Sequence, residues 1–448
     1  MKPGEEIFRE VAIERMVPGG EGLGRVDGVV ALVRDVYPGD RVTAALAAEG
    51  PRLFRGRAVE VLSPGPHARQ PGAVCPRAAD GTCGGCDWPR ARPDSAKALK
   101  TELVLDALRR IGGLDASEIP SPGFVPSPSN YRLRNRLHRG PDGRLGFFAP
   151  RSNRVVADLS VCEIVSGALL ARLPAIRESF RRLGPAEGEL ATLEDRSGEL
   201  LLGEFRPAPG TGRGLSWSGG RGPFDGFRVR DRESRVLFED GPSALELETR
   251  TATFRVAVSS FFQGNRFLLD AFLDEVRSAL SAARGGEGPP AGPLRALDLF
   301  AGVGFLTRPL LEEAGERGGE VVAVEVDASS SSDLSANLRR WHEGGLPPAR
   351  CAVTTAEAFL APASRRAESG VFDVVVADPP RAGLSPAVRR ELLRMRPRAL
   401  VMVSCDPPTL GRDLAALHGA YRLDRLTLLD LFPGTHHVEA VALLVQRT

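Results

Sequence analysis

The sequence has few cysteines and no long hydrophobic run. Six cysteines occur in 448 residues. No uncharged stretch approaches the roughly 20 apolar residues that a membrane-spanning helix needs, and the residues from Met1 to Glu6 contain no apolar signal core. We therefore expect a cytoplasmic protein without membrane contact. In a reducing compartment, a group of cysteines indicates a metal site or a nucleophile rather than disulfides.

The chain also lacks an internal repeat and an excess of one charge. Its 59 Lys and Arg nearly balance 57 Asp and Glu, so the net charge of +2 does not identify a partner. Residues 121–160 differ from this average, with seven Arg, two Asp and no Glu. Arg132, Arg134 and Arg136 alternate there, and in a strand they would share one face that could contact phosphates, with Arg139 close by. A solvated sheet face without a ligand is the alternative interpretation.

Changes in periodicity divide the chain into five parts. Short alternating apolar stretches split by Gly pairs predict a five-stranded β-barrel of the OB type for residues 1–62. A cysteine-rich segment of the central domain (63–94) precedes a helix region (95–120) that we expect to pack on the C-terminal domain, and then a mainly β central domain (121–257). Alternating strands and helices predict a Rossmann-like α/β domain for residues 258–448, whose ligands should lie at the carboxyl ends of its strands.

The first such strand end carries a glycine-rich turn. Gly302 and Gly304 would let the backbone approach a ligand at a helix N-terminus, and Glu325 at the end of the next strand could bind the ribose hydroxyls of a nucleoside. A dinucleotide fingerprint would require a third glycine at position 307, which is Thr307. Together with a terminal hairpin, the pattern favours an S-adenosylmethionine-dependent methyltransferase over an NAD-dependent dehydrogenase.

A second strand end reads "ADPPR" (377–381). The two prolines fix the backbone and would hold the Asp378 carboxylate where it can accept a hydrogen bond from a substrate N–H. Enzymes that methylate amino groups use a related turn in which an aromatic residue follows the prolines. Here that position is Arg381, so methylation of an exocyclic nitrogen is disfavoured.

Cys405 follows a third buried strand and could act as a nucleophile. A small packing residue is the alternative, and it is our interpretation of Cys351. Uracil C5 is a poor nucleophile until a thiolate adds to C6, and a base must then remove the C5 proton so that the thiolate can leave. Glu439 in the terminal hairpin is the candidate base, with His436 and His437 as neighbours that could orient groups.

Five motifs in this order resemble the RNA (uracil-5-)-methyltransferase family over essentially the whole C-terminal half: "FFQGN" (261–265), "LDLFAGVG" (297–304), "ADPPRAG" (377–383), "VSCDPPTL" (403–410) and "FPGTHHVE" (432–439). The resemblance implies Cys405 as nucleophile, Glu439 as base, and Asp378 holding the uracil and lining the cofactor pocket. It also implies that Gln263, Phe300, Gly302, Glu325 and Glu357 surround S-adenosylmethionine. Several members have Asn where this chain has Phe305.

The remaining cysteines form a possible four-thiolate set, Cys75, Cys83, Cys86 and Cys162. Their spacing alone suits structural zinc and a [4Fe-4S] cluster about equally. Iron–sulfur members of the family have such a set, with a shorter first gap, so the resemblance favours the cluster. We expect it to hold the cysteine-rich segment against the central domain.

The resemblance further implies an RNA substrate. The barrel is similar to the TRAM domain of many members, and together with the cluster cysteines it suggests a uridine of 23S ribosomal RNA rather than of a tRNA T-loop. A non-enzymatic RNA-binding or chaperone protein that retains the fold is the alternative from another class. We expect a monomer that contacts RNA through Arg132, Arg134, Arg136 and Arg139.

Overall fold

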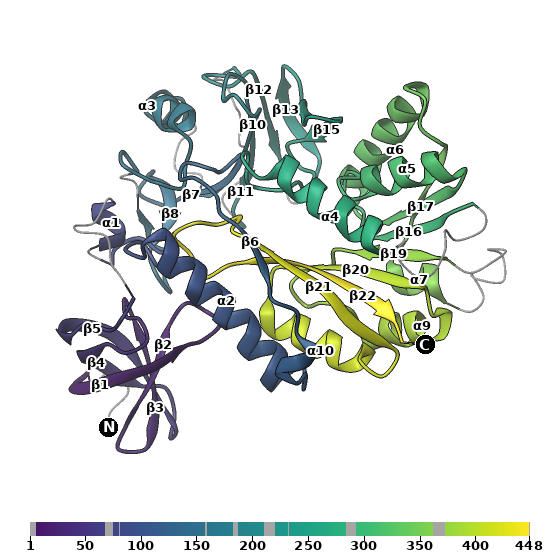
Figure 1. Ribbon diagram of the computed structural model, residues 1–448. Coiled ribbons are helices and arrows are strands. Elements are labelled where there is room, and N and C mark those ends of the chain that lie inside the picture. Colours follow the sequence, from purple (N-terminus) through teal and green to yellow (C-terminus); the bar gives the residue numbers. More distant parts are fainter. Residues whose placement is uncertain are drawn as a thin grey trace.

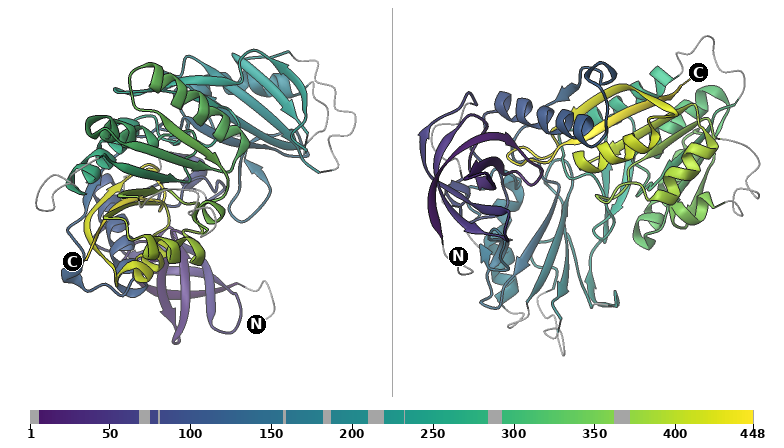
Figure 2. Two further views of the ribbon diagram at one scale, coloured as in Figure 1. Left: turned by 90° about the vertical axis from the view of Figure 1, so that its right-hand side faces the viewer. Right: turned by 90° about the horizontal axis from the view of Figure 1, so that it is seen from below.

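A computed structural model describes residues 6–67, 75–79, 81–156, 159–181, 187–209, 220–231, 233–283, 293–361 and 372–447. The linker that the sequence predicts at 284–292 lies outside them. Figures 1 and 2 show three lobes, with the N-terminal barrel at one end and the α/β domain, drawn in green and yellow, at the other. Within the described parts of the chain, every helix is too short or too polar to span a bilayer.

The N-terminal lobe is a closed five-stranded barrel, as predicted. Its strands follow the order β1-β2-β3-β5-β4. Alternate side chains of these strands, such as Val11, Val33 and Leu46, are fully buried inside the barrel. The bounds are β1 (Ile7–Met16), β2 (Gly22–Val26), β3 (Val29–Arg34), β4 (Arg41–Ala48) and β5 (Leu53–Ser63).

The central lobe is a seven-stranded sheet with the order β13-β12-β11-β10-β7-β8-β9. Helix α3 (Gly167–Arg181) belongs to the same core, since Ile176 and Phe180 cluster with Leu137 and Phe205 from the sheet. The mainly β character predicted for this region is therefore confirmed. The bounds are β7 (Arg134–Arg139), β8 (Leu145–Phe148), β9 (Val155–Val156), β10 (Gly188–Glu194), β11 (Leu201–Pro207), β12 (Gly226–Arg230) and β13 (Val236–Asp240).

The C-terminal lobe is the predicted doubly wound α/β domain. Its eight-stranded sheet has the order β18-β17-β16-β19-β20-β22-β21-β6. The central strands are mostly apolar, as expected for a sheet with both faces covered, with the buried Asp298 in β16 as an exception. The strands are β16 (Arg295–Leu299), β17 (Glu320–Glu325), β18 (Ala349–Val353), β19 (Val374–Ala377), β20 (Ala399–Ser404), β21 (Tyr421–Leu429) and β22 (Glu439–Gln446). The helices are α4 (Leu269–Ala283), α5 (Thr307–Arg317), α6 (Ala328–Glu343), α7 (Ala356–Leu360), α9 (Pro386–Met395) and α10 (Pro407–Leu417).

Two segments at the ends of the region 121–257 contact the α/β domain. Strand β6 (Gly123–Val125) pairs in parallel with β21 at the edge of the large sheet. The hairpin β14 (Ala244–Glu248) and β15 (Thr253–Ala257) lies on α6, where the Asn337 side chain accepts a hydrogen bond from the Arg255 N–H at 2.7 Å. The sequence of these short strands does not show which domain they pack against. The domain limits given by the sequence therefore remain a proposal.

Helix α2 (Pro93–Arg110) connects the lobes and runs beside α10 (Figure 1). Its apolar side, including Val104 and Leu108, is buried in the same cluster as the α10 side chains. The fully buried Lys100 donates to Asp430 at 2.5 Å and to the Phe432 carbonyl at 3.1 Å. Burial lowers the pKa of Lys100 and raises that of Asp430. This ion pair therefore holds α2 against the loop that precedes β22. The short helices α1 (Pro76–Ala79) and η1 (Ala116–Glu118) flank α2 in the chain.

The sequence periodicity predicts a helix from about residue 260, but α4 begins only at Leu269. The residues before Leu269 do not form a helix, because the Asn265 side chain makes hydrogen bonds to backbone groups. Its side chain accepts from the N–H groups of Phe267 and Leu268 and donates to the Leu431 carbonyl at 2.9 Å. The loop 258–268 is thereby held against the C-terminal loop, and Gln263 is positioned on it.

Candidate active site

The candidate residues meet at one edge of the large sheet. Strands β17, β16, β19 and β20 are neighbours and parallel, so their carboxyl ends lie side by side. Glu325 ends β17, Asp378 follows β19 and Cys405 follows β20. Strand β22 runs antiparallel to β20, with Ala440 opposite Ser404, so that Glu439 starts next to Cys405. The sheet order therefore brings together groups that are far apart in the chain.

The glycine-rich turn after β16 forms a cradle at this edge. The Gly302 N–H donates to one oxygen of the Glu325 carboxylate at 2.8 Å. The other oxygen accepts hydrogen bonds from the backbone N–H groups of the two residues that follow Glu325. Gly302 has a φ of 57°, and a Cβ built on it would meet no atom within 4 Å. Phe300 also has a positive φ, 65°, which is costly for a bulky residue. The open space beside Gly302, next to a fixed carboxylate, fits the nucleoside part of S-adenosylmethionine.

Asp298, which we did not single out from the sequence, supports this turn. Its carboxylate is fully buried and accepts a hydrogen bond from the Thr307 hydroxyl at 2.5 Å. The other oxygen, Oδ1, has no partner among the described residues, and burial raises the pKa of Asp298 to about 8. Thr307, the residue that replaces the third glycine of a dinucleotide fingerprint, therefore anchors the turn from inside. The motif position was visible in the sequence, but its burial was not.

Phe305 does not line this cradle. It is 5% exposed and packs in an aromatic cluster with Phe254, Phe262 and Phe272 at centroid distances of 5.4–5.5 Å. Several family members have Asn at this position, whereas this chain has an apolar ring that lies in the core under the loop that carries Gln263.

Gln263, Asp378 and Glu439 form a polar group beside the cradle, in which Gln263 and Glu439 are buried and Asp378 is half-buried. Gln263 Nε2 donates to Asp378 Oδ2 at 3.4 Å. Burial raises the pKa of Asp378 to about 7, whereas the Gln263 hydrogen bond lowers it. Burial, and after it the charge of Asp378, raises the pKa of Glu439. Glu439 Oε1 has no partner among the described residues, so this carboxyl group is able to exchange a proton with a ligand.

Cys405 lies half-buried between these carboxyl groups and a cation. Burial and the neighbouring Glu439 raise the pKa of its thiol to about 11, while Arg381 lowers it. Without a ligand the side chain is therefore a neutral thiol at pH 7, adjacent to groups that can take its proton. A thiol, a proton acceptor and a carboxyl group with an unpaired oxygen are the elements that covalent addition and elimination require.

In RNA-free protein, we expect the alkylation rate of Cys405 to keep rising at pH values where an ordinary thiol is already ionised. Only the thiolate is alkylated, so the iodoacetamide rate should increase about tenfold per pH unit between pH 7 and 10. Glu439→Gln removes a carboxylate that raises the pKa of Cys405 and should accelerate alkylation at pH 9. Peptide mass spectrometry measures both rates, with Cys351 as internal reference. A plateau near pH 8.5 in the unmodified protein would contradict the buried environment.

The loop before β22 joins this site to the cysteine-rich segment. Asp87 Oδ2 accepts from His436 Nδ1 at 2.6 Å, and the Trp88 N–H donates to the Gly434 carbonyl at 3.0 Å. His437 Nε2 lies 3.3 Å from the Arg381 guanidinium, and burial lowers the pKa of His437 to about 3. Both histidines thus orient neighbouring groups. Asp87 had no signal in the sequence beyond its place next to Cys86.

The four cysteines of the predicted metal set surround one small cavity. Cys75, Cys83, Cys86 and Cys162 all line it, together with the apolar Phe147, Leu159 and Ile164. Burial, and after it the charges of the other three thiols, raises the pKa of Cys86. Four thiols that line one common cavity fit an all-thiolate metal site.

The other predicted residues are spread more widely. Glu357 is exposed in the first turn of α7, which follows β18 at the same edge of the sheet. The Arg132 guanidinium lies over the Phe147 ring at 5.7 Å, beside the cysteine cavity. Arg134 is largely buried and donates to the Val258 carbonyl at 3.0 Å.

Arg136 and Arg139 lie on opposite faces of β7. Arg136 is 72% exposed and pairs with Glu189 from the adjacent strand at 3.1 Å. The sequence segment contains no Glu, so this partner was not foreseen. Arg139 is 5% exposed and donates to the Phe180 carbonyl at the end of α3. Arg139 is therefore not a proposed RNA contact, because its side chain supports α3.

The fold and the nucleoside cradle define an S-adenosylmethionine-dependent methyltransferase. Residues 348–447 match the model of the family described as tRNA (Uracil-5-)-methyltransferase. Proteins described as uncharacterized RNA methyltransferases share 31% identity over 97% of each chain in Thermosynechococcus vestitus and 30% over 98% of each chain in Streptomyces avermitilis. The chain belongs to the RNA (uracil-5-)-methyltransferase family.

A solved structure has the same fold along nearly its whole length. The tRNA (uracil-54, C5)-methyltransferase of Pyrococcus abyssi, in complex with S-adenosyl-L-homocysteine, superimposes with a TM-score of 0.68 at 22% identity, covering 97% of this chain and all of that one. The protein is thus an S-adenosylmethionine-dependent RNA methyltransferase, and uracil C5 is the position that its family methylates.

Proposed function

We propose that the protein methylates C5 of a uridine in 23S ribosomal RNA through a covalent bond between Cys405 and C6 of the base. The observation that carries the covalent mechanism is the sheet order, which sets Cys405, Asp378 and Glu439 on adjacent strand ends beside the Gly302 cradle. The choice of 23S ribosomal RNA over a tRNA is supported by the closed N-terminal barrel and the four cysteines around one cavity. Gln263, Phe300, Gly302, Glu325 and Glu357 are the proposed contacts of S-adenosylmethionine, which supplies the methyl group when bound.

The chain's own residues account for the proton transfers. Cys405 loses its proton to water, which leaves Glu439 unprotonated for the later step, and its sulfur bonds to C6, which places negative charge on C5 and O4. Asp378, whose pKa burial raises to about 7, is partly protonated at pH 7 and holds the uracil through hydrogen bonds. Once C5 is methylated, Glu439 removes the C5 proton, the C6–S bond breaks, and the sulfur leaves as thiolate. A uracil inside a helix hides C6, so the base must come from a loop or be flipped out.

The nature of the RNA can be tested directly in cells. In a strain that lacks this chain, 5-methyluridine should disappear from one position of 23S ribosomal RNA and remain in the tRNA T-loop. Mass spectrometry of nuclease fragments from both RNA pools, with the parent strain as control, gives the answer. Loss from the T-loop alone would move the substrate to tRNA, and no loss in either pool would favour a non-enzymatic RNA-binding protein.

We further propose that Cys75, Cys83, Cys86 and Cys162 hold a [4Fe-4S] cluster, with zinc as the alternative. The fit rests on four thiols around one apolar cavity, and the proposed role is structural. The cluster would fix the 83–88 segment, which contacts the central sheet through the Gly84 N–H and the Phe148 carbonyl and the C-terminal loop through Asp87.

The remaining parts of the proposal concern the surroundings of the enzyme. We propose that the barrel is a TRAM domain, that Arg132, Arg134 and Arg136 lie near the RNA backbone, and that the protein acts as a cytoplasmic monomer. Of the three arginines, Arg136 has the most exposed side chain and so gives the clearest test of a phosphate contact.

A further inference from the structure

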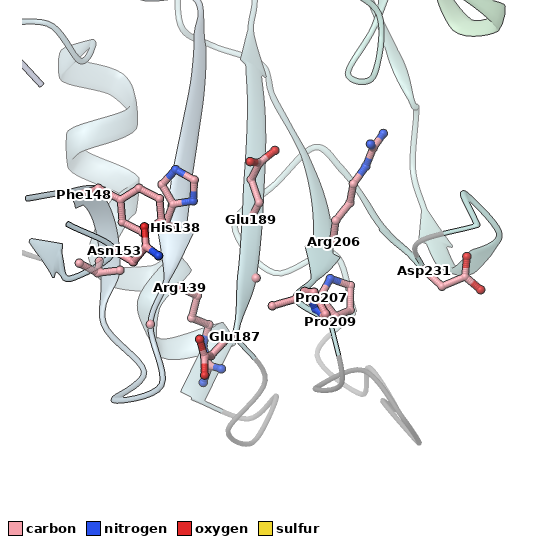
Figure 3. Close-up of a pocket in the computed structure, with 14 residues that line it drawn as sticks. His138, Arg139, Phe148, Asn153, Glu187, Glu189, Arg206, Pro207, Pro209 and Asp231 are labelled. Atoms are coloured by element: carbon pink, nitrogen blue, oxygen red, sulfur yellow. The ribbon is translucent and has the colours of Figure 1, made fainter. Parts of the chain in front are cut away.

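The face of the central sheet that points away from α3 carries a cavity of about 480 Å³ (Figure 3). Its volume lies in the range of ligand pockets, roughly 300–1,000 Å³. In the register of the sheet, His138 lies opposite Glu189 and Glu189 opposite Arg206. These three side chains therefore stand in one row on one face, as Figure 3 also shows. Phe148, Asn153 and Asp231 also line the cavity.

An aromatic platform lies at one end of this row. The His138 and Phe148 rings are stacked, with centroids 3.7 Å apart and planes 12° from parallel. The two residues are diagonal neighbours on β7 and β8, because His138 pairs with Gly146. Burial lowers the pKa of His138, so that at pH 7 the imidazole offers a neutral flat surface. Every nucleobase can stack on such a surface, whatever its sequence.

A cluster of arginines lies at the other end of the row. The buried Glu204 carboxylate is shared by Arg206, Arg228 and Arg230, at 2.7, 2.5 and 3.3 Å. Arg228 also lies 3.8 Å from the Glu239 carboxylate, and Arg206 is 48% exposed. Three acidic residues, Glu187, Glu189 and Asp231, also line the cavity, and Glu189 is paired with Arg136. Arg206 is the half-exposed guanidinium of this cluster that lines the cavity, so a phosphate would bind beside it.

The same face leads to the methylation site. Arg228 donates to the Ser259 hydroxyl at 2.9 Å, and Arg134 donates to the Val258 carbonyl. Residues 258–260 continue directly into the loop that carries Gln263 beside Asp378. A single RNA strand can thus extend from the cavity past Arg206, Arg228 and Arg134 toward Cys405.

We propose that this cavity binds an unpaired nucleotide of the RNA substrate other than the target uridine, with its base stacked on His138 and its phosphate beside Arg206. Asn153 offers an amide to the edge of the base. The inference rests on the RNA substrate of the proposed function, but not on the Cys405 chemistry, because it is tested by binding without turnover.

The test uses the full-length protein and two fluorescein-labelled 12-nucleotide RNAs, oligouridylate and its abasic counterpart. His138→Ala should weaken binding of oligouridylate about tenfold and leave abasic binding unchanged, because only a base can stack. His138→Phe, which keeps a flat ring, should bind like the unmodified protein. Arg206→Gln should weaken binding of both RNAs and reduce the slope of log affinity against log salt by about one.

Arg181→Gln is the matched control, since it removes an exposed arginine from α3 on the other side of the sheet. It should change neither affinity. S-adenosylhomocysteine affinity, measured by calorimetry, should be equal in all variants and shows that the fold is intact. Equal oligouridylate binding by His138→Ala and the unmodified protein would overturn the proposal, as would a loss in His138→Phe as large as in His138→Ala. Repeating the assay in Cys405→Ala separates this result from any failure of the catalytic mechanism.

Discussion

Cys405→Ala and Glu439→Gln should both abolish useful turnover, but they should stop the reaction at different points. Cys405→Ala removes the atom that bonds to C6, so RNA and S-adenosylmethionine should still bind while no covalent adduct and no methylated product forms. Glu439→Gln retains the nucleophile and loses the base. It should add to C6 and methylate C5, then release product about 10²- to 10⁴-fold more slowly, the usual contribution of a general base.

A denaturing gel distinguishes the two variants. The stalled Glu439→Gln species should migrate as a slow protein–RNA band that carries a labelled methyl group. RNA with 5-fluorouridine at the target position should trap the same band in the unmodified enzyme, because fluorine cannot leave as a cation. Normal turnover by Glu439→Gln, or equal trapping by Cys405→Ala, would show that the roles are assigned wrongly and that Cys405 is a packing residue.

Cys162→Ala should prevent binding of the proposed cluster and slow methyl transfer about a hundredfold, although the residue lies outside the methylation site. The expected loss arises from position: without the cluster, the 83–88 segment no longer fixes the loop between Phe432 and Glu439. A displacement of about 1 Å at a reacting group is enough for a hundredfold effect. Iron and sulfide assays, the visible absorption spectrum and single-turnover rates measure the two consequences together.

Two variants separate metal binding from loop position. Cys351→Ala removes a cysteine from β18, far in sequence from the set, and should keep both iron and activity. Asp87→Asn should keep the iron but weaken the link to His436, so that trapping by 5-fluorouridine stays normal and release of methylated product slows. Full activity of iron-free Cys162→Ala would contradict the structural role. Stoichiometric zinc in colourless protein would change the metal and leave the positional argument in place.

The sequence determined the elements of this protein and the strand ends that carry its polar residues. Alternation of period two gave the barrel and the central sheet, and apolar strands followed by glycine or proline turns gave the α/β domain. These patterns are local, since each records which side of its own strand or helix is buried. They also indicated Asp378 and Cys405, because parallel strands of one sheet end at one edge.

Only the tertiary structure decided which elements are neighbours. Glu439 lies beside Cys405 because β22 pairs antiparallel with β20, and Asp87 reaches His436 across 349 residues of chain. The neighbouring strand gives Arg136 its partner Glu189, and the packing of α3 turns Arg139 away from solvent. A periodic pattern cannot encode such contacts, because it reports the burial of a side chain and not the identity of the group that covers it.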